Sequence, residues 1–232
     1  MTELSALLIT AVSLALFHTV IGVDHYLPFV ALSRANGWTM RKTLLIVFAC
    51  GAGHVLSSVL LGFIGIALSS GVTALADIED IRGEIATCFL IAFGLAYTIY
   101  GIRSAVKNKI HSHISPDGQT VTHAHSGSGE GHKHRRGGKA NLFWGLFVLF
   151  VLGPCEPLIP LLMYPAATLN VPALVLVTAV FAAGTIGTML LMTFLGIKGI
   201  RLLKITGLER YSHAMAGSAI LICGVSLLLL PI

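Results

Sequence analysis

Two acidic residues lie inside apolar stretches long enough to span a membrane, at matching places in the two halves of the chain. Asp24 precedes His25 in the first stretch, and Glu156 follows Cys155 in a later one. A carboxylate at the centre of a bilayer costs about 2.5–3.5 kcal/mol, so such a residue is usually retained for a function. A proline four residues after each acid removes a helical N–H and frees the carbonyl oxygen of the acid. The pattern predicts a cation site built on broken helices.

The same apolar stretches carry further side chains that bind transition metals. His18 and His25 are separated by roughly 10 Å along a straight helix, too far to share one ion. Either the helix unwinds near Gly22, or the two histidines serve successive steps along a path. Imidazole and carboxylate suit Ni, Co, Zn, Mn or Fe, and a thiolate favours softer ions. The predicted membrane site consists of His18, Asp24, His25, His54, Cys155 and Glu156.

Composition predicts an integral membrane protein of the all-α class. The chain of 232 residues is 55% hydrophobic and only 11% charged, whereas soluble domains average about 25% charged residues. Several uncharged apolar runs exceed the length of roughly 18 residues expected of a membrane-spanning helix. We predict six spans, at roughly 5–33, 43–70, 84–104, 142–166, 172–197 and 211–231.

The distribution of lysine and arginine predicts the orientation in the membrane. Fourteen of the fifteen basic residues fall in the loops after spans 1, 3 and 5, and Arg82, in the predicted loop after span 2, is the exception. The positive-inside rule therefore places these three loops in the cytoplasm and both termini outside, in the plasma (inner) membrane. The basic residues lie between apolar runs, so the net charge of +5 does not indicate nucleic-acid binding.

The two halves of the chain align at an offset of 130–132 residues through three spans each. Because each half has an odd number of spans, we expect a 3+3 inverted repeat with proline-broken helices. Such repeats place their substrate near the midplane, between the halves. The predicted organisation is a first three-helix repeat (1–105), a flexible cytoplasmic loop (106–140) and a second three-helix repeat (141–232).

The loop of residues 106–140 is polar, of low complexity and rich in histidine. It contains three His-x-His pairs, at His111, His113, His123, His125, His132 and His134. Histidine-rich tracts bind transition metals, and this composition cannot build a core of its own. We predict an auxiliary metal site in this loop, which would collect metal for export, or buffer and sense it after import.

Two families resemble different parts of the chain. His18, Asp24-His25 and Gly53-His54, together with the histidine-rich loop, resemble the NicO-type nickel/cobalt transporters, which include membrane relatives of urease accessory proteins. That family has His-x4-Asp-His in an early span. The spacing here is one residue longer, so His18 departs from the family pattern, whereas Asp24 and His25 match it. The resemblance implies a transporter of nickel or cobalt.

The segment from Gly153 to Pro160, which contains Cys155, resembles the Pro-Cys motif of the cytochrome-biogenesis and disulfide-reductase membrane family. Those thiol carriers pair two cysteines, one in the first span of each repeat. Here Val23 occupies the position in span 1 that corresponds to Cys155, so Cys50 would have to serve as the partner. Small exporters of sulfite and amino acids share this general architecture. Anionic substrates require a basic site within the membrane, but every Lys and Arg here is expected to lie at or beyond the ends of the spans.

We therefore predict a transporter of divalent transition-metal cations that works in the direction of efflux. Its expected cargo is Ni or Co, with Zn, Mn or Fe as further candidates. It would not be an enzyme, would hold no permanent cofactor, would contact membrane lipid and would exchange protons as counter-ions because protons compete with metal for these ligands. The alternative is a thiol–disulfide carrier that uses Cys155 and Cys50. A third class is a metal sensor or assembly protein that does not transport. Oligomeric state does not follow from the sequence.

Overall fold

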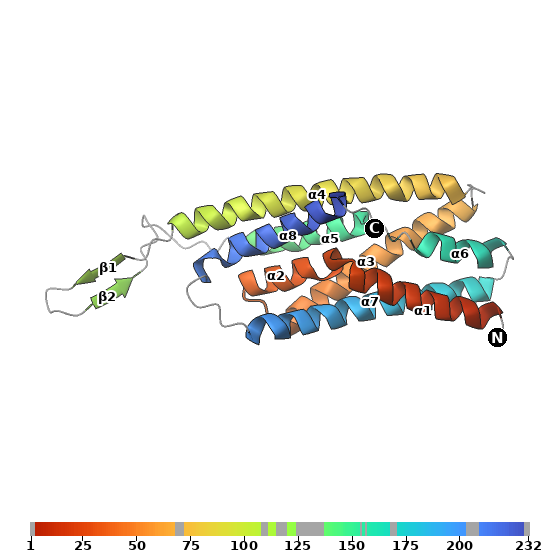
Figure 1. The fold of residues 1–232 in the computed structure, drawn as a ribbon, viewed down its shortest axis with the longest axis horizontal. Helices are drawn as coiled ribbons and strands as arrows, with labels where there is room; N and C mark the ends of the chain where they lie inside the picture. The colour runs from red at the N-terminus through yellow and green to blue at the C-terminus, as the bar shows by residue number, and fades with distance from the viewer. Residues whose placement is uncertain are drawn as a thin grey trace.

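The chain forms a bundle of helices along one long axis, with a small hairpin at one end (Figure 1). The computed structural model describes residues 3–67, 72–107, 111–114, 120–123, 137–153, 155, 157–167, 171–202 and 209–229. The elements in chain order are α1 (Glu3–Ile21), the 3-10 turn η1 (Val23–His25), α2 (Leu27–Ala35), α3 (Met40–Ala67), α4 (Val72–Lys107), β1 (His111–Ile114), β2 (Thr120–His123), α5 (Gly137–Leu152), α6 (Leu158–Ala167), α7 (Val171–Leu202), the 3-10 turn η2 (Glu209–Tyr211) and α8 (Ser212–Leu229).

The outer surface of this bundle is apolar, as a lipid environment requires. Phe17 is 68% exposed and Trp144 59% exposed, and many other large apolar side chains also lie on the surface. Within the described residues, five helical segments are long and apolar enough to cross a membrane: Glu3–Ile21, Met40–Ile64, Asp77–Val106, Val171–Leu202 and Glu209–Leu229. The chain is therefore an integral membrane protein.

Two of the predicted spans are interrupted. The first is divided into α1, η1 and α2, and the fourth into the shorter helices α5 and α6. Helices α1, α3 and α4 run in directions opposite to α5, α7 and α8 respectively (Figure 1). An inverted 3+3 arrangement of six spans requires these directions, but it stays a prediction, since five helices meet the criteria for a span.

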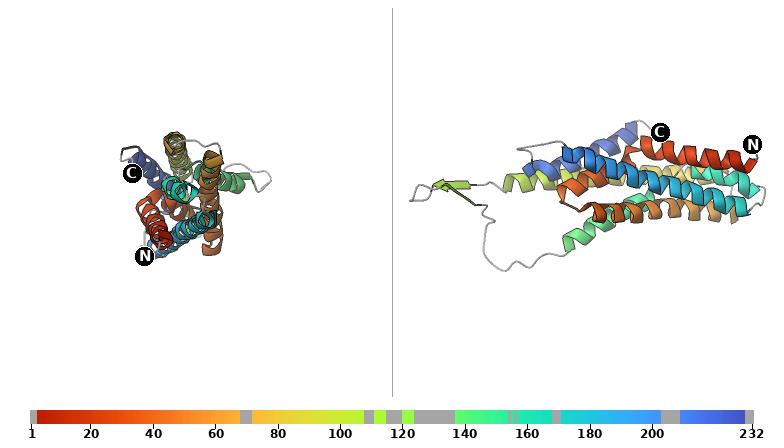
Figure 2. Two further views of the ribbon diagram at one scale, coloured as in Figure 1. Left: turned by 90° about the vertical axis from the view of Figure 1, so that its right-hand side faces the viewer. Right: turned by 90° about the horizontal axis from the view of Figure 1, so that it is seen from below.

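Glycines bring α4 and α8 into close backbone contact. A Cβ atom added to Gly217 would overlap the backbone N of Thr98, and one added to Gly101 would overlap the backbone of Ala214. Small residues at such positions let membrane helices approach closely, so that dispersion forces hold them together where lipid offers no hydrophobic driving force. The end-on view shows the resulting bundle (Figure 2).

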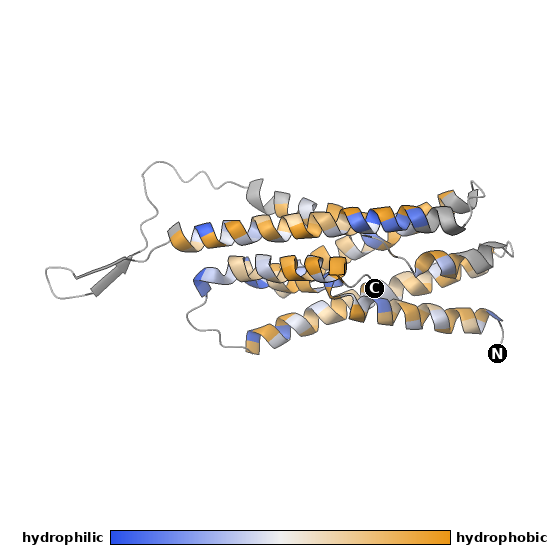
Figure 3. Ribbon diagram, turned by 45° about the horizontal axis from the view of Figure 1, so that its top comes forward, coloured by the Kyte–Doolittle hydropathy of each residue, from blue (hydrophilic) through white to orange (hydrophobic). Residues whose placement is uncertain are grey.

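One predicted loop is wrong. The sequence predicted that residues 71–83 lie between spans 2 and 3, where Asp77, Glu79, Asp80 and Arg82 fall close together beside Glu84. In the structure α4 begins at Val72 and contains all of these charges, which form polar turns in its first half (Figure 3). Of them, Glu79 is only 1% exposed. The expectation that all basic residues lie at or beyond span ends is therefore wrong for Arg82.

The histidine-rich loop is not wholly without regular structure. Strands β1 and β2 form an antiparallel pair in which His111 lies opposite His123 and His113 lies opposite Val121. His125, His132 and His134 lie outside the described residues. The regular structure of the described residues is therefore helical apart from this hairpin.

Candidate functional site

The break after α1 brings two predicted ligands together. Helix α1 ends at Ile21, and Gly22 adopts φ −70° and ψ 84° before the 3-10 turn. The chain therefore unwinds at Gly22, and the ring centroids of His18 and His25 lie 4.7 Å apart. A Cβ atom on Gly22 would lie 2.6 Å from Nδ1 of His25. A glycine is thus required for the ring to occupy this position.

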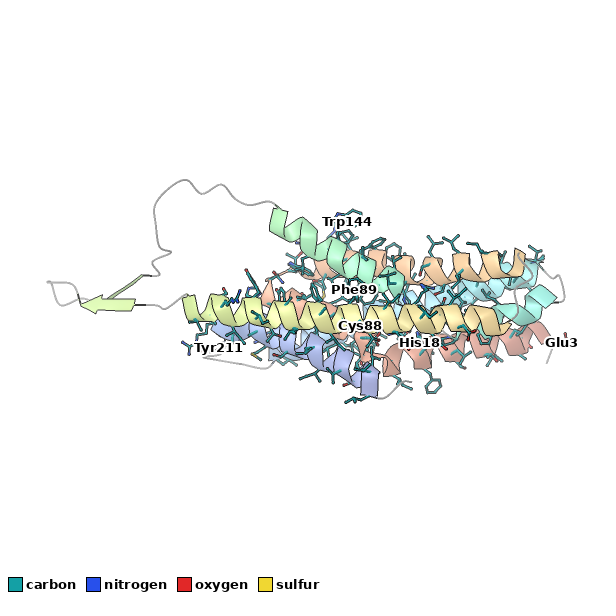
Figure 4. All side chains as sticks on the ribbon, turned by 90° about the horizontal axis from the view of Figure 1, so that it is seen from above. Glu3, His18, Cys88, Phe89, Trp144 and Tyr211 are labelled. Carbon is teal, nitrogen blue, oxygen red and sulfur yellow. The ribbon has the colours of Figure 1, made fainter. Side chains whose placement is uncertain are left out.

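Two further predicted residues reach the same place from other helices. His54 comes from the middle of α3, and Cys155 lies between α5 and α6. Ligand atoms of His18, His54 and Cys155 all lie within 4.8 Å of one another, and the ring of His25 is 5.2 Å from that of His54. Figure 4 shows His18 well inside the length of the bundle, away from Glu3 and Tyr211 near its two ends. We call His18, His25, His54 and Cys155 the His/Cys cluster.

The histidines of the His/Cys cluster leave one nitrogen each without a hydrogen-bond partner. Nδ1 of His25 lies 3.0 Å from the carbonyl oxygen of Gly22, and Nδ1 of His54 lies 3.2 Å from that of Phe150. Only a protonated Nδ1 can donate to a carbonyl. In the neutral ring, Nε2 then carries the lone pair. Within the described part of the chain, Nε2 of His18, His25 and His54 is buried and has no partner.

This arrangement matches what metal ligation requires. A histidine that ligates a metal almost always donates its other ring N–H to a carbonyl or carboxylate, which fixes the ring and its tautomer. A buried polar group left without a partner costs about 1–3 kcal/mol, so three such groups at one place are costly unless something binds them. The cluster can chemically bind a cation with an affinity for imidazole and thiolate.

The remaining predicted ligands have different positions. The carboxylate of Asp24 lies 3.3 Å from Nδ1 of His25, and its side chain is 29% exposed. Asp24 thus contacts the imidazole on the side away from Nε2, where it would orient His25 instead of binding the ion. Glu156 lies outside the described residues.

The sequence analysis missed a charged network beside the cluster. Arg82 of α4 forms an ion pair with Glu79 and donates hydrogen bonds to Ser57 Oγ at 2.8 Å and to the carbonyl oxygen of Val151 at 2.9 Å. The signal was present in the sequence, because Arg82 is the one basic residue that departs from the positive-inside pattern. Its i, i+3 spacing from Glu79 is also typical of a helical ion pair.

The relationship to known proteins rests on one extensive match. The family described as the cytochrome C biogenesis protein transmembrane region matches residues 27–229. The chain belongs to this family. No match was found among curated proteins or among solved structures.

Membership of the cytochrome C biogenesis transmembrane family supports one of the two resemblances. It favours a thiol–disulfide or cytochrome-biogenesis type of function, which was the alternative hypothesis, and it does not support the nickel/cobalt resemblance. The matched region includes His54 and Cys155 but begins after His18 and His25.

The two cysteines of the alternative hypothesis, Cys50 and Cys155, lie in different core clusters. All four cysteines lie among the described residues and form no disulfide with one another. Cys50 packs in a core cluster with Phe29 and Met189, whereas Cys155 packs in a second cluster with Leu158 and Phe181. Ligand atoms of His18 and His54 lie within 4.8 Å of the Cys155 thiol.

Proposed function

We propose that the chain binds a transition-metal cation at the His/Cys cluster and carries it across the membrane. Two observations carry this proposal. The buried Nε2 atoms of His18, His25 and His54 have no hydrogen-bond partner, and ligand atoms of His18 and His54 lie within 4.8 Å of the thiol of Cys155. Nitrogen and sulfur ligands favour borderline and soft cations such as Zn, Ni and Co over Mg or Ca. The cation is the cargo, so no resident cofactor is needed.

The position of the cluster favours transport over storage. Both broken helices contribute to it, since His25 comes from the first break and Cys155 from the second. Broken helices at the midplane are the elements around which the two halves of inverted-repeat transporters move. A movement of one half relative to the other would expose the cluster to each face in turn. Protons are the expected counter-ions, and efflux is the expected direction because the histidine-rich loop is predicted to be cytoplasmic.

The test is uptake of metal into proteoliposomes that hold the purified protein. We expect Ni, Co or Zn to accumulate with wild type and accumulation to fall steeply in Asp24→Asn, because the asparagine weakens the orientation of His25. Correctly folded wild type that accumulates none of these metals would contradict the proposal.

A second candidate, the thiol–disulfide carrier, is favoured by the family match. The double variant Cys50→Ser with Cys155→Ser separates the two functions, because a thiol carrier loses all activity without its thiols. A metal carrier keeps its three imidazoles and is expected to retain transport at saturating metal. Its affinity should fall by about 100-fold, since loss of an outer-shell partner alone costs about 10–100-fold. Metal uptake and reduction of a disulfide substrate are measured on the same preparation, with Cys88→Ser as control.

The hairpin refines the role proposed for the histidine-rich loop. Residues i and i+2 of a strand, and residues directly opposite across a pair, lie on one face. The register therefore places positions 111, 113 and 123 on the same face. We expect the double variant Thr122→His with His123→Thr, which keeps the composition, to weaken metal binding by full-length protein by about 100-fold, since loss of an outer-shell partner alone costs about 10–100-fold.

The matched control for the hairpin is His134→Ala, which removes one histidine elsewhere in the same loop. Equal affinity of the double variant and wild type for nickel, measured by calorimetry, would show that the loop collects metal without a defined site.

A further inference from the structure

Arg82 links three helices next to the His/Cys cluster. Its guanidinium donates to Ser57 Oγ at 2.8 Å and, more weakly, to Ser58 Oγ at 3.4 Å, both on α3. It also donates to the carbonyl oxygens of Val151 at 2.9 Å and Gly153 at 3.3 Å. These two carbonyls belong to the last turn of α5 and the residue just after it. Carbonyl oxygens at the end of a helix have no N–H donor in a following turn. A cation there also opposes the negative end of the helix dipole.

An ion pair within α4 also holds the Arg82 side chain in this position. It forms an ion pair with Glu79, one turn earlier on α4, and the two side chains are only 16% and 2% exposed. Breaking a buried ion pair leaves an uncompensated charge, so Arg82 cannot leave its partners without a coordinated movement of α4. The contacts therefore join α3, α4 and α5 at one point.

This junction lies on one particular side of the cluster. Ser57 and Ser58 follow His54 by about one helical turn, or roughly 5 Å, along α3. They lie on the side of His54 towards the end of α3, which is the end of the bundle where the N-terminus lies (Figure 1). Gly153, which Arg82 contacts, is two residues from Cys155. The contacts of Arg82 with α3 therefore lie between His54 and that end of the bundle.

We propose that Arg82 is a gate residue that closes the His/Cys cluster towards the N-terminal end of the bundle. It acts by position: its hydrogen bonds hold the end of α5 against α3, and Cys155 is buried with 0% exposure beside them. Opening requires the guanidinium to release Ser57 and Val151 together. The gate does not depend on which cargo the cluster carries, so it can be tested even if the metal proposal fails.

The test uses Cys155 as its own reporter. In the full chain with Cys50→Ala, Cys88→Ala and Cys223→Ala, Cys155 is the remaining cysteine. This protein is placed in sealed vesicles of either orientation, and a membrane-impermeant methanethiosulfonate reagent is added outside. A separate cysteine-free chain with Glu3→Cys identifies which orientation exposes the N-terminal end. We expect Arg82→Gln to raise the rate of Cys155 labelling by about 10-fold or more from that end only, because local opening limits access.

Arg34 provides a matched control, since it also donates to a carbonyl oxygen on another helix, that of Ile200. Arg34→Gln should leave labelling from the N-terminal end unchanged. An unchanged rate in folded Arg82→Gln, or an equal rise from both faces, would overturn the gate. If Arg82→Gln does not fold, Ser57→Ala with Ser58→Ala keeps the charge and removes two acceptors. That variant should show a smaller rise from the same end, and no rise would overturn the gate.

Discussion

Replacing His54 by alanine is expected to abolish high-affinity metal binding within the membrane. His54 is 3% exposed, and its Nε2 has no hydrogen-bond partner although its Nδ1 is bound to the carbonyl of Phe150. Loss of an outer-shell partner alone costs about 10–100-fold in metal affinity, and loss of a ligand should cost at least the upper end of that range. The measurement is calorimetric titration of purified protein with Ni²⁺ or Zn²⁺, in a chain whose six loop histidines are replaced by serine.

Two further variants keep this experiment interpretable. His18→Leu preserves side-chain volume and should reduce affinity to a similar extent, because Nε2 of His18 is also buried and without a hydrogen-bond partner. His213→Ala is the matched control, since His213 lies in a separate cluster with Tyr97. It should bind metal as wild type does. Unaltered affinity in both His54→Ala and His18→Leu would contradict a metal site at the His/Cys cluster.

Replacing Gly217 by leucine is expected to prevent the bundle from assembling. An added Cβ atom would overlap the backbone of Thr98, and backbone cannot move aside as a flexible side chain can. Overpacking costs about 1–3 kcal/mol even where side chains adjust, and this contact recurs along the α4–α8 interface at Gly94, Gly101 and Gly224. We expect loss of monodisperse protein in size-exclusion chromatography, or a markedly lower melting temperature in detergent.

Helix α7 offers the control for this substitution. Gly187 and Gly199 are helical, and an added Cβ atom at either position would meet no atom within 4 Å. Gly187→Ala and Gly199→Ala should be neutral or stabilise the protein by about 0.5–1 kcal/mol, since alanine is the better helix former. If Gly217→Leu melted at the same temperature as these two variants, the proposed close contact of α4 with α8 would be wrong.

The part of the site that lies in the first span, His18 and His25, could be predicted from the residues near it in the sequence. Gly22 and Pro28 both disfavour a continuous helix, and a break between His18 and His25 was one of two ways to account for their spacing. The structure contains that break. The membrane class followed from hydropathy alone, because apolar runs of that length have few alternatives.

The contact of Cys155 with His54 could not be predicted in this way, because it depends on packing between distant segments. Cys155 meets His54 only because α5 packs on α3, and no local pattern encodes that contact. The network of Arg82 was missed for a different reason. Closely spaced charges were read as a solvated loop, whereas the ion pair with Glu79 and acceptors on two other helices allow Arg82 to lie within the bundle.

The unequal lengths of the helices have a consequence for how the protein sits in lipid. With 36 residues α4 is about 54 Å long, and α1 with 19 residues is about 28 Å long. The hydrocarbon core of a bilayer is about 30 Å thick, and helices tilt by at most about 40°, so part of α4 must extend beyond the hydrocarbon core. Changes in bilayer thickness will therefore be absorbed by sliding of α4 through the interface. The first span is also long, because α1 is continued past its break by η1 and α2. It can adjust to a change of acyl-chain length by bending at Gly22, beside the His/Cys cluster.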